Sequence, residues 1–295
     1  MASLREIRRR IRGVRSTGQI AKAMETVAAS KMQRAQAQTL ASRPYAEKAM
    51  FVLHSLARQA RPSAEPLHPL LVQRPVERIG IVLYTANRGL CGAFNSNTIR
   101  KAVEFIKSQE RPVSFIAVGR KGRDFLTRYG FQVEAEFTSI PDRPTSLDIL
   151  PVARIAIADY LAGRWDTVYL AYTRFVNTLV QRPTITRLLP LEPVWETGAP
   201  SSVDYIYEPD PRTILDPVLP RFTELQIYQA MLESIASEQS ARMVAMRNAR
   251  EAATDLIAGL TLKYNKARQE AITKELLDIA GGAEALTIAM SGARV

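Results

Sequence analysis

The sequence predicts an α/β protein with a long antiparallel coiled coil of N- and C-terminal helices and an inserted Rossmann-like α/β domain. Three observations predict this fold class. Both ends of the chain carry seam residues alternately three and four positions apart, which is typical of paired helices. The middle alternates strand-like and helix-like runs, and proline is concentrated there. We expect an N-terminal coiled-coil helix at 1–60, the α/β domain at 61–219 and a C-terminal coiled-coil helix at 220–295.

The first expected element is a helix over residues 3–57, with a kink at Pro44. Ser3 and Glu6 resemble a capping box at its start. Most residues of its seam are small, so a partner helix could approach closely. The seam consists of Leu4, Ile7, Ile11, Val14, Gly18, Ala21, Glu25, Ala28, Met32 and Ala35.

The middle of the chain is expected to form a parallel sheet covered by helices on both faces, because strands and helices alternate. Proline-rich residues 183–220 are expected to hold one or two edge strands, including 204–207. The expected strands are 78–85, 113–118, 131–136 and 167–172, and the expected helices are 94–107, 119–129 and 147–161.

The last expected element is a helix over residues 221–280, a stretch without proline. At 1.5 Å per residue it would reach about 90 Å, too long for a compact core. Pairing the two terminal helices with each other would bury both seams in a single interface. The second seam is expected at Leu225, Tyr228, Leu232, Ile235, Gln239, Arg242, Met246, Ala249, Ala253, Leu256, Leu260, Tyr264, Ala267 and Ala271.

The net charge of +11 is concentrated at the N-terminus, where residues 1–60 hold 12 Lys and Arg against 3 Asp and Glu. Such a segment should meet nucleic acid, anionic lipid or an acidic protein surface, although a charge run is often only a solvated face. A basic coiled-coil protein that binds nucleic acid is therefore an alternative. Nucleic-acid binding is disfavoured because no aromatic side chain precedes Tyr45, and the basic residues share the helix that carries the seam.

Two short stretches resemble sites of chemistry. Gly13 and Gly18 have the spacing of a phosphate-binding loop, but the loop's lysine is missing and both lie in a helical run, so we expect a helix crossing and no nucleotide binding. The turn Asn87–Gly92 follows a strand and precedes a helix, where α/β domains often bind ligands. An α/β enzyme working at that turn is a further alternative, although a tight turn around a buried thiol is the simpler interpretation.

No catalytic, cofactor or metal site is expected. His54, His68 and Cys91 match no metal-ligand spacing, and neither histidine is placed to activate the thiol. A single cysteine excludes an internal disulfide and fits a reducing compartment.

Several long motifs resemble the γ subunit of F-type ATP synthase, in the family's order and along the full chain, least distinctively at 100–200. One departure is Asn87, where the family commonly has an acid. The motifs are IRRRIRGVRSTGQIAKAMETVAASKM (7–32), NRGLCGAFN (87–95), YIYEPDP (205–211), SEQSARMVAM (237–246) and YNKARQEAITKEL (264–276), followed by GGAEAL.

This resemblance implies a central rotor shaft that couples proton- or sodium-driven ring rotation to conformational cycling of the catalytic β subunits. Its implied partners are the α and β subunits of an α3β3 ring, the ε subunit and the membrane c-ring. The implied location is peripheral, on the cytoplasmic face of the cell inner membrane. A dithiol switch like that of photosynthetic relatives is not expected, because Cys91 is the chain's one cysteine.

The resemblance also assigns contact residues. Contacts with the acidic lever loop of β are implied for Arg8, Arg9, Arg12, Lys22, Met24 and Arg242. Contacts with the catch loops of α and β are implied for Arg268, Gln269 and Thr273. Contacts with the rotor ring and ε are implied for Tyr205, Tyr207 and Glu208, and the small apolar tip 283–295 is expected to act as a bearing.

Overall fold

The computed structural model describes residues 3–59, 68–191 and 211–292 of the chain. The chain forms two compact units: unit 1 is Met1–Glu25 with Met246–Val295, and unit 2 is Thr26–Ala245. Two long helices, α1 (Leu4–Gln59) and α5 (Pro211–Gly292), contribute residues to both units. The expected long terminal helices are therefore confirmed.

Unit 2 contains a five-stranded sheet with the order β3-β2-β1-β4-β5. The first four strands are parallel, as expected, but β5 runs antiparallel to β4. Only residues 176–180 connect β4 to β5, which suffices for a hairpin but not for a crossover to a parallel strand. The strands are β1 (Ile79–Tyr84), β2 (Val113–Val118), β3 (Gln132–Phe137), β4 (Thr167–Phe175) and β5 (Gln181–Leu189). The strand predicted at 204–207 lies outside the described residues.

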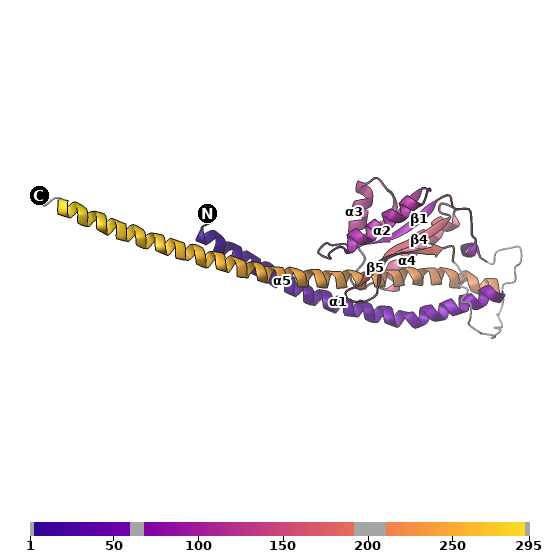
Figure 1. Cartoon of the computed structure of the whole chain (residues 1–295). Coiled ribbons are helices and arrows are strands. Elements are labelled where there is room, and N and C mark those ends of the chain that lie inside the picture. The colour runs from indigo at the N-terminus through magenta and orange to yellow at the C-terminus, as the bar shows by residue number, and fades with distance from the viewer. Residues whose placement is uncertain (1–2, 60–67, 192–210, 293–295) are drawn as a thin grey trace. The chain divides into compact units, whose positions relative to one another are not determined.

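Helices cover both faces of the sheet, as the sequence predicts. One face packs on α2 (Phe94–Ser108) and α3 (Arg120–Arg128) through a core that includes Ile81, Phe115 and Leu126. The other face packs on α4 (Ser146–Leu161) and on α5, through Val82, Ile116 and Ile227 among others (Figure 1). Alternate residues of β1 enter opposite cores because strand side chains alternate in direction. A short 3-10 helix, η1 (Pro69–Leu71), adds Leu70 to the second core.

A glycine in β1 makes room for a large aromatic ring. A Cβ atom on Gly80 would lie 2.4 Å from the Trp165 ring, closer than any real contact. Trp165 is buried, and its indole nitrogen donates to the Ser114 hydroxyl at 2.7 Å. The ring thereby covers β1 and satisfies its one polar atom.

Helix α5 begins ten residues earlier than the sequence predicts, so the expected start at 221 is wrong. The prediction treated proline as a helix boundary, but Pro217 and Pro220 lie inside the helix. Each removes one backbone hydrogen bond. Burial of Leu215, Leu219 and Phe222 against the sheet offsets that loss.

Within unit 1, α1 and α5 pack against each other in antiparallel register. Arg8 contacts Tyr264, Gly18 faces Ala253, and Glu25 contacts Arg247, so the partner number falls as the α1 number rises. The predicted antiparallel pairing is therefore confirmed. Gly18 also confirms the predicted close crossing, because a Cβ added there would lie 3.4 Å from the Ala253 Cβ.

Two positions of the predicted second seam are wrong. Ala249 and Leu256 are exposed, Leu256 by 53%, and the adjacent residues Arg250 and Ile257 are half-buried instead. After Met246 the seam could continue three residues on, at Ala249, or four residues on, at Arg250, because both choices keep the alternation of threes and fours. The second spacing places the Arg250 guanidinium against the carboxylate of Glu25, which lies in the α1 seam.

Among the residues that the structure describes, no helix combines the length and the apolar character needed to cross a membrane.

Candidate functional site: contact surfaces of the two helices

The predicted lever-contact residues of α1 lie in unit 1. Arg9, Arg12 and Lys22 are exposed, whereas Met24 is half-buried. Arg8 is also exposed, but its guanidinium donates to the Tyr264 hydroxyl and lies 5.3 Å from the centre of that ring. The predicted basic face therefore exists on α1, and one of its members also holds the two helices together.

A second cluster in unit 1 joins the helices through Glu25. Its carboxylate accepts from Arg247 at 3.0 Å and lies 3.2 Å from the Arg250 guanidinium. The Glu25 side chain is 16% exposed, and the two arginines are 49% and 40% exposed. This acid therefore neutralises charge at the seam and leaves basic groups at the surface.

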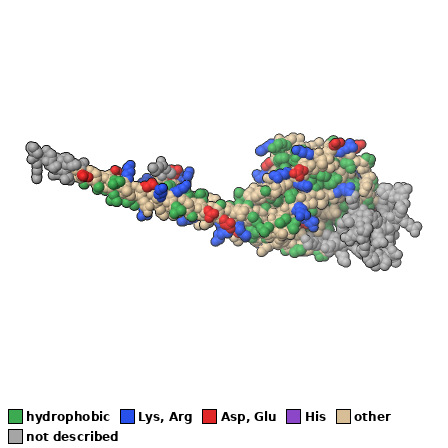
Figure 2. Space-filling view, viewed as in Figure 1, with side chains coloured by type: hydrophobic (Ala, Val, Ile, Leu, Met, Phe, Trp, Pro, Cys, Tyr) green, Lys and Arg blue, Asp and Glu red, His purple; other side chains and the backbone are tan. Residues whose placement is uncertain are grey.

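The predicted catch-loop residues Arg268, Gln269 and Thr273 are all exposed on α5. Gln269 and Thr273 are one helical turn apart and so share a face. Further along the same helix Leu276, Leu277 and Ile279 are 62%, 67% and 69% exposed. In Figure 2 apolar side chains alternate with charged ones along the surface of unit 1. Three large apolar side chains in four residues indicate a surface that a partner covers.

Arg242, also predicted as a lever contact, has a different setting in unit 2. It is buried, pairs with Glu238 at 2.7 Å and donates to the Gly89 carbonyl at 3.3 Å. Burial raises the pKa of Glu238, and the neighbouring guanidinium partly opposes that rise. Arg242 thus attaches α5 to the turn Asn87–Gly92.

The turn itself is a structural element. Leu90 and Gly92 have positive φ angles of 63° and 56°. Asn87 accepts from the Arg120 backbone nitrogen at 3.0 Å, at the start of α3. This contact needs only an acceptor oxygen, so Asn87 can replace the family's acid there.

Cys91 lacks the setting of a nucleophile. It is buried, and its Sγ accepts from Asn95 at 3.2 Å. Burial raises the pKa of the thiol, which disfavours the reactive thiolate. His68 lies elsewhere, with Nδ1 accepting from the Leu70 backbone nitrogen and Nε2 3.7 Å from Asp216. The side chain of His54 is outside the described set.

Sequence reasoning missed the contacts that hold unit 2 around α5. Ser237 donates to the Thr173 carbonyl at 3.1 Å, and Ser240 donates to the Thr178 carbonyl at 2.6 Å. On α1, Lys31 pairs with Asp142 at 2.5 Å. The pair Asn177-Thr178 lies between two apolar pairs, but this loop contains no glycine, so the sequence lacks the usual hairpin signal.

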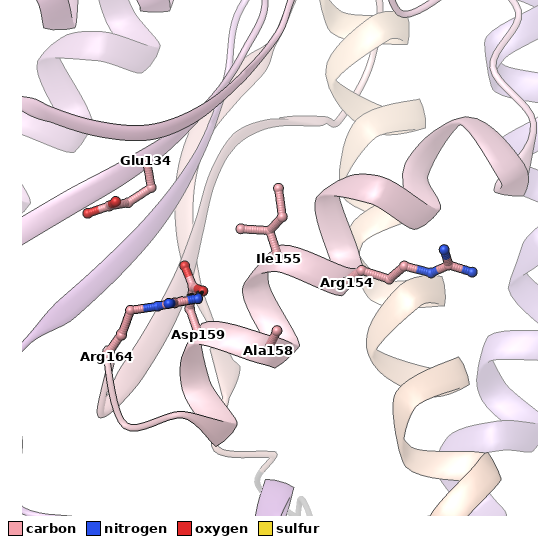
Figure 3. A pocket seen from close by; sticks show the side chains of 6 residues that line it. All are labelled: Glu134, Arg154, Ile155, Ala158, Asp159 and Arg164. Atoms are coloured by element: carbon pink, nitrogen blue, oxygen red, sulfur yellow. Dashed lines mark hydrogen bonds and ion pairs between the residues drawn. The ribbon is translucent and has the colours of Figure 1, made fainter.

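An open pocket of about 480 Å³ lies beside α4 and β3 (Figure 3). Two of its polar groups pair with each other, because Arg164 donates through Nε to Asp159 at 2.9 Å. Arg154 points away from this pair (Figure 3). The described residues also hold no group of three or more His, Cys, Asp or Glu side chains that could bind a metal.

The predicted rotor-ring and ε contacts Tyr205, Tyr207 and Glu208 lie outside the described residues. Gly13 and Gly18 lie within α1, so the apparent phosphate-loop spacing belongs to a helix. The fold defines a helical stalk protein, in which two long paired helices carry an α/β domain.

Comparisons with known proteins place the chain within a family. A family model described as ATP synthase matches residues 3–286. ATP synthase gamma chains from Dehalococcoides mccartyi strain CBDB1 and Herpetosiphon aurantiacus are each 53% identical to this chain. The first match covers 97% of this chain and 100% of the relative, and the second covers 97% and 99%.

Solved structures have the same fold. The rotor of the Euglena gracilis mitochondrial ATP synthase has a TM-score of 0.62 at 20% identity, over 91% of this chain and 98% of that one. The central stalk and c-ring structure of the Tetrahymena thermophila enzyme gives 0.57 at 25% identity, over 78% and 99%. The chain belongs to the ATP synthase gamma chain family and is a non-catalytic subunit of the central stalk.

Proposed function

We propose that this central-stalk subunit couples rotation of a membrane c-ring, driven by protons or sodium ions, to conformational cycling of catalytic β subunits. The proposed partners are an α3β3 ring, the ε subunit and the c-ring. Support comes from the gamma chain relatives and from the Tetrahymena structure, which contains a central stalk together with a c-ring.

The observation that carries the proposal is the unequal surface of the helix pair in unit 1. Basic side chains such as Arg9 and Arg12 are exposed on α1, whereas apolar Leu276 and Leu277 are exposed on α5. A turning pair with unequal sides presents different contacts to each surrounding subunit. Only such a difference in contact free energy can shift a partner between conformations.

We assign the lever contact with β to the exposed basic residues of α1, and Met24 as their apolar neighbour. Charge complementarity would attract an acidic segment to Arg9, Arg12 and Lys22. Arg8 would serve both the partner and Tyr264. Arg242 is buried, so its proposed role is to hold the turn that it bonds through Gly89.

We assign the catch contact to Arg268, Gln269 and Thr273. Their side chains are exposed, and an arginine fork can donate two hydrogen bonds to one carboxylate. The proposed contact of Tyr205, Tyr207 and Glu208 with the ring and ε rests on sequence resemblance. The bacterial relatives support the proposed location, the cytoplasmic face of the inner membrane.

The test is a double substitution on α5 in the reconstituted complex. Arg268→Ala with Gln269→Ala should lower coupled ATP synthesis while leaving the unfolding of the α/β domain unchanged. The control is Lys266→Ala with Glu270→Ala, which removes two exposed side chains of the same helix that are not assigned to the catch contact. Equal rates in the two double variants would contradict the catch assignment.

A further inference from the structure

The hairpin between β4 and β5 ends in a well-defined loop. The Asn177 side-chain oxygen accepts from the backbone nitrogens of Leu179 and Val180 at 2.9 and 2.8 Å. The Val180 carbonyl accepts from the backbone nitrogens of Val176 and Asn177 at 3.3 and 3.1 Å. These four bonds fix the loop backbone and therefore the direction of its side chains.

The loop is also attached to α5. Ser240 donates to the Thr178 carbonyl at 2.6 Å, and Gln181 donates to the Ser240 hydroxyl at 3.3 Å. Gln181 donates in addition to the Thr178 carbonyl at 2.9 Å. The loop is therefore positioned by the helix that we propose rotates.

This fixed loop exposes apolar side chains. Val176 is 50% exposed, Leu179 78% and Val180 45%. Single exposed apolar residues are normal on a protein surface. Three within five residues, on a loop held by hydrogen bonds, form a small patch of the kind that partners cover.

Two arginines flank the patch in an unfavourable arrangement. Arg174 and Arg182 are directly opposite each other in the β4–β5 register, and both are exposed. Like charges directly opposite across two strands are destabilising. Neither guanidinium forms a hydrogen bond or ion pair within the part of the chain that the structure describes. Repulsion between the two arginines therefore lowers the stability of the isolated chain, and a bound anion would remove that repulsion.

We propose that this hairpin end, formed by Arg174, Val176, Leu179, Val180 and Arg182, docks a carboxylate-rich protein segment of a neighbouring subunit. Carboxylates would bridge the two guanidiniums, and apolar side chains of the same segment would cover Leu179. Phosphate groups could satisfy the arginines but would leave the aliphatic patch uncovered, which favours a protein partner. The inference rests on the proposed assembly into an ATP synthase, and it adds a contact on the sheet to those on the helices.

The first experiment uses one substitution that should stabilise the isolated chain but weaken its assembly into the complex. Arg182→Glu replaces a like-charge pair by an ion pair, so the isolated full-length chain should gain stability in urea unfolding. The same change removes half of the anion site, so reconstitution with the other ATP synthase subunits should require roughly tenfold more chain. Lys101→Glu, an equal charge change on exposed α2, is the control and should reconstitute normally.

The outcomes separate this proposal from the one it rests on. If the unaltered chain fails to reconstitute, the proposed assembly is wrong. If it reconstitutes and Arg182→Glu does so equally well, the docking role of the hairpin end is wrong.

The second experiment identifies the partner directly. A photoreactive benzoylphenylalanine replaces Leu179 in the assembled complex, and a matched probe replaces Leu147, which is 70% exposed on α4. We expect the probe at 179 to crosslink a peptide rich in Asp and Glu that the probe at 147 does not capture. A peptide without acidic residues, a nucleic acid or no adduct at 179 would overturn the proposal.

Discussion

Helix α5 has two parts that differ in how much of their surface is buried. Between residues 222 and 245 of α5, every side chain is buried or half-buried. Between residues 246 and 284, only Met246 and Ala253 are buried, and the buried and half-buried positions together recur at intervals of three and four. The first part packs on the sheet and on α1 within unit 2, whereas the second packs on α1 along one seam within unit 1. Packing within the chain therefore specifies the first part, whereas most of the surface of the second part is exposed and available to the proposed partners.

The largest expected contrast comes from one substitution made in both parts. Leu232 is fully buried and Leu262 is 72% exposed. Leu232→Ala should cost about 4 kcal/mol because it removes buried methyl groups and leaves a cavity. Leu262→Ala should cost less than about 0.5 kcal/mol. Urea unfolding of the full-length variants measures both, and similar losses would contradict the comparison.

A buried and an exposed arginine provide the next contrast. Each pairs with a glutamate whose side chain is 16% exposed, but Arg242 is 11% and Arg247 49% exposed. Arg242→Met leaves Glu238 as a buried unpaired charge and should cost about 3 kcal/mol at pH 8. Arg247→Met should cost less than about 1 kcal/mol, because Arg250 still faces Glu25.

The pH dependence of Arg242→Met has a definite sign. Burial already raises the pKa of Glu238, and removing the guanidinium raises it further. A raised carboxyl pKa gives stability at low pH that is lost as the pH rises through that value. The loss of stability in this variant should therefore be smaller at pH 5 than at pH 8. A loss independent of pH would show that Glu238 is not the cause.

The closeness of the seam in unit 1 can be tested at two glycines of α1. A Cβ on Gly18 would already touch Ala253, whereas one on Gly13 would meet nothing within 4 Å. Gly18→Leu should cost about 1 to 2 kcal/mol through overpacking. Gly13→Leu should stabilise the helix by up to about 1 kcal/mol, because glycine is a poor helix former. Thermal unfolding would reveal opposite signs, and the same sign for both variants would contradict the close crossing.

The smallest expected effect tests whether exposure or location determines the strength of an ion pair. Lys31 and Asp142 pair in unit 2, with side chains 35% and 69% exposed. Lys31→Met should cost less than about 1 kcal/mol, comparable to Arg247→Met in unit 1. The hydrogen bond from Lys31 lowers the pKa of Asp142, so this contribution is present at neutral pH and lost as the pH falls through the lowered value. A loss near that of Arg242→Met would show that location matters more than exposure.

The sequence predicts the repeating features of this fold and misses those that depend on tertiary contacts. Strand β2 has the predicted bounds, and the start of α2 at Phe94 is also as predicted, because periodicity and turn residues are local signals. The start of α5 was missed because burial of Leu215 and Leu219 outweighs the local effect of two prolines. The seam at Arg250 was missed because its choice depends on Glu25, which is more than 200 residues away in sequence.

The candidate contact surfaces follow the same division. Charge and resemblance indicated the exposed basic residues of α1, but could not show that Arg242 is buried beside Gly89. They also could not indicate the hairpin end, because the opposition of Arg174 and Arg182 exists only in the β4–β5 register. A pairing between two strands is not a property of either strand's sequence alone.

The narrow crossing at Gly18 and Ala253 has a mechanical consequence. Small side chains let two helix axes approach more closely than large ones do. A bar resists twisting less when its material lies nearer the central axis, and here that material is two backbones with little between them. This segment should therefore wind and unwind more easily under load than a pair spaced by leucines. In the proposed rotor, energy delivered at one end would then be held as elastic strain before it does work at the other.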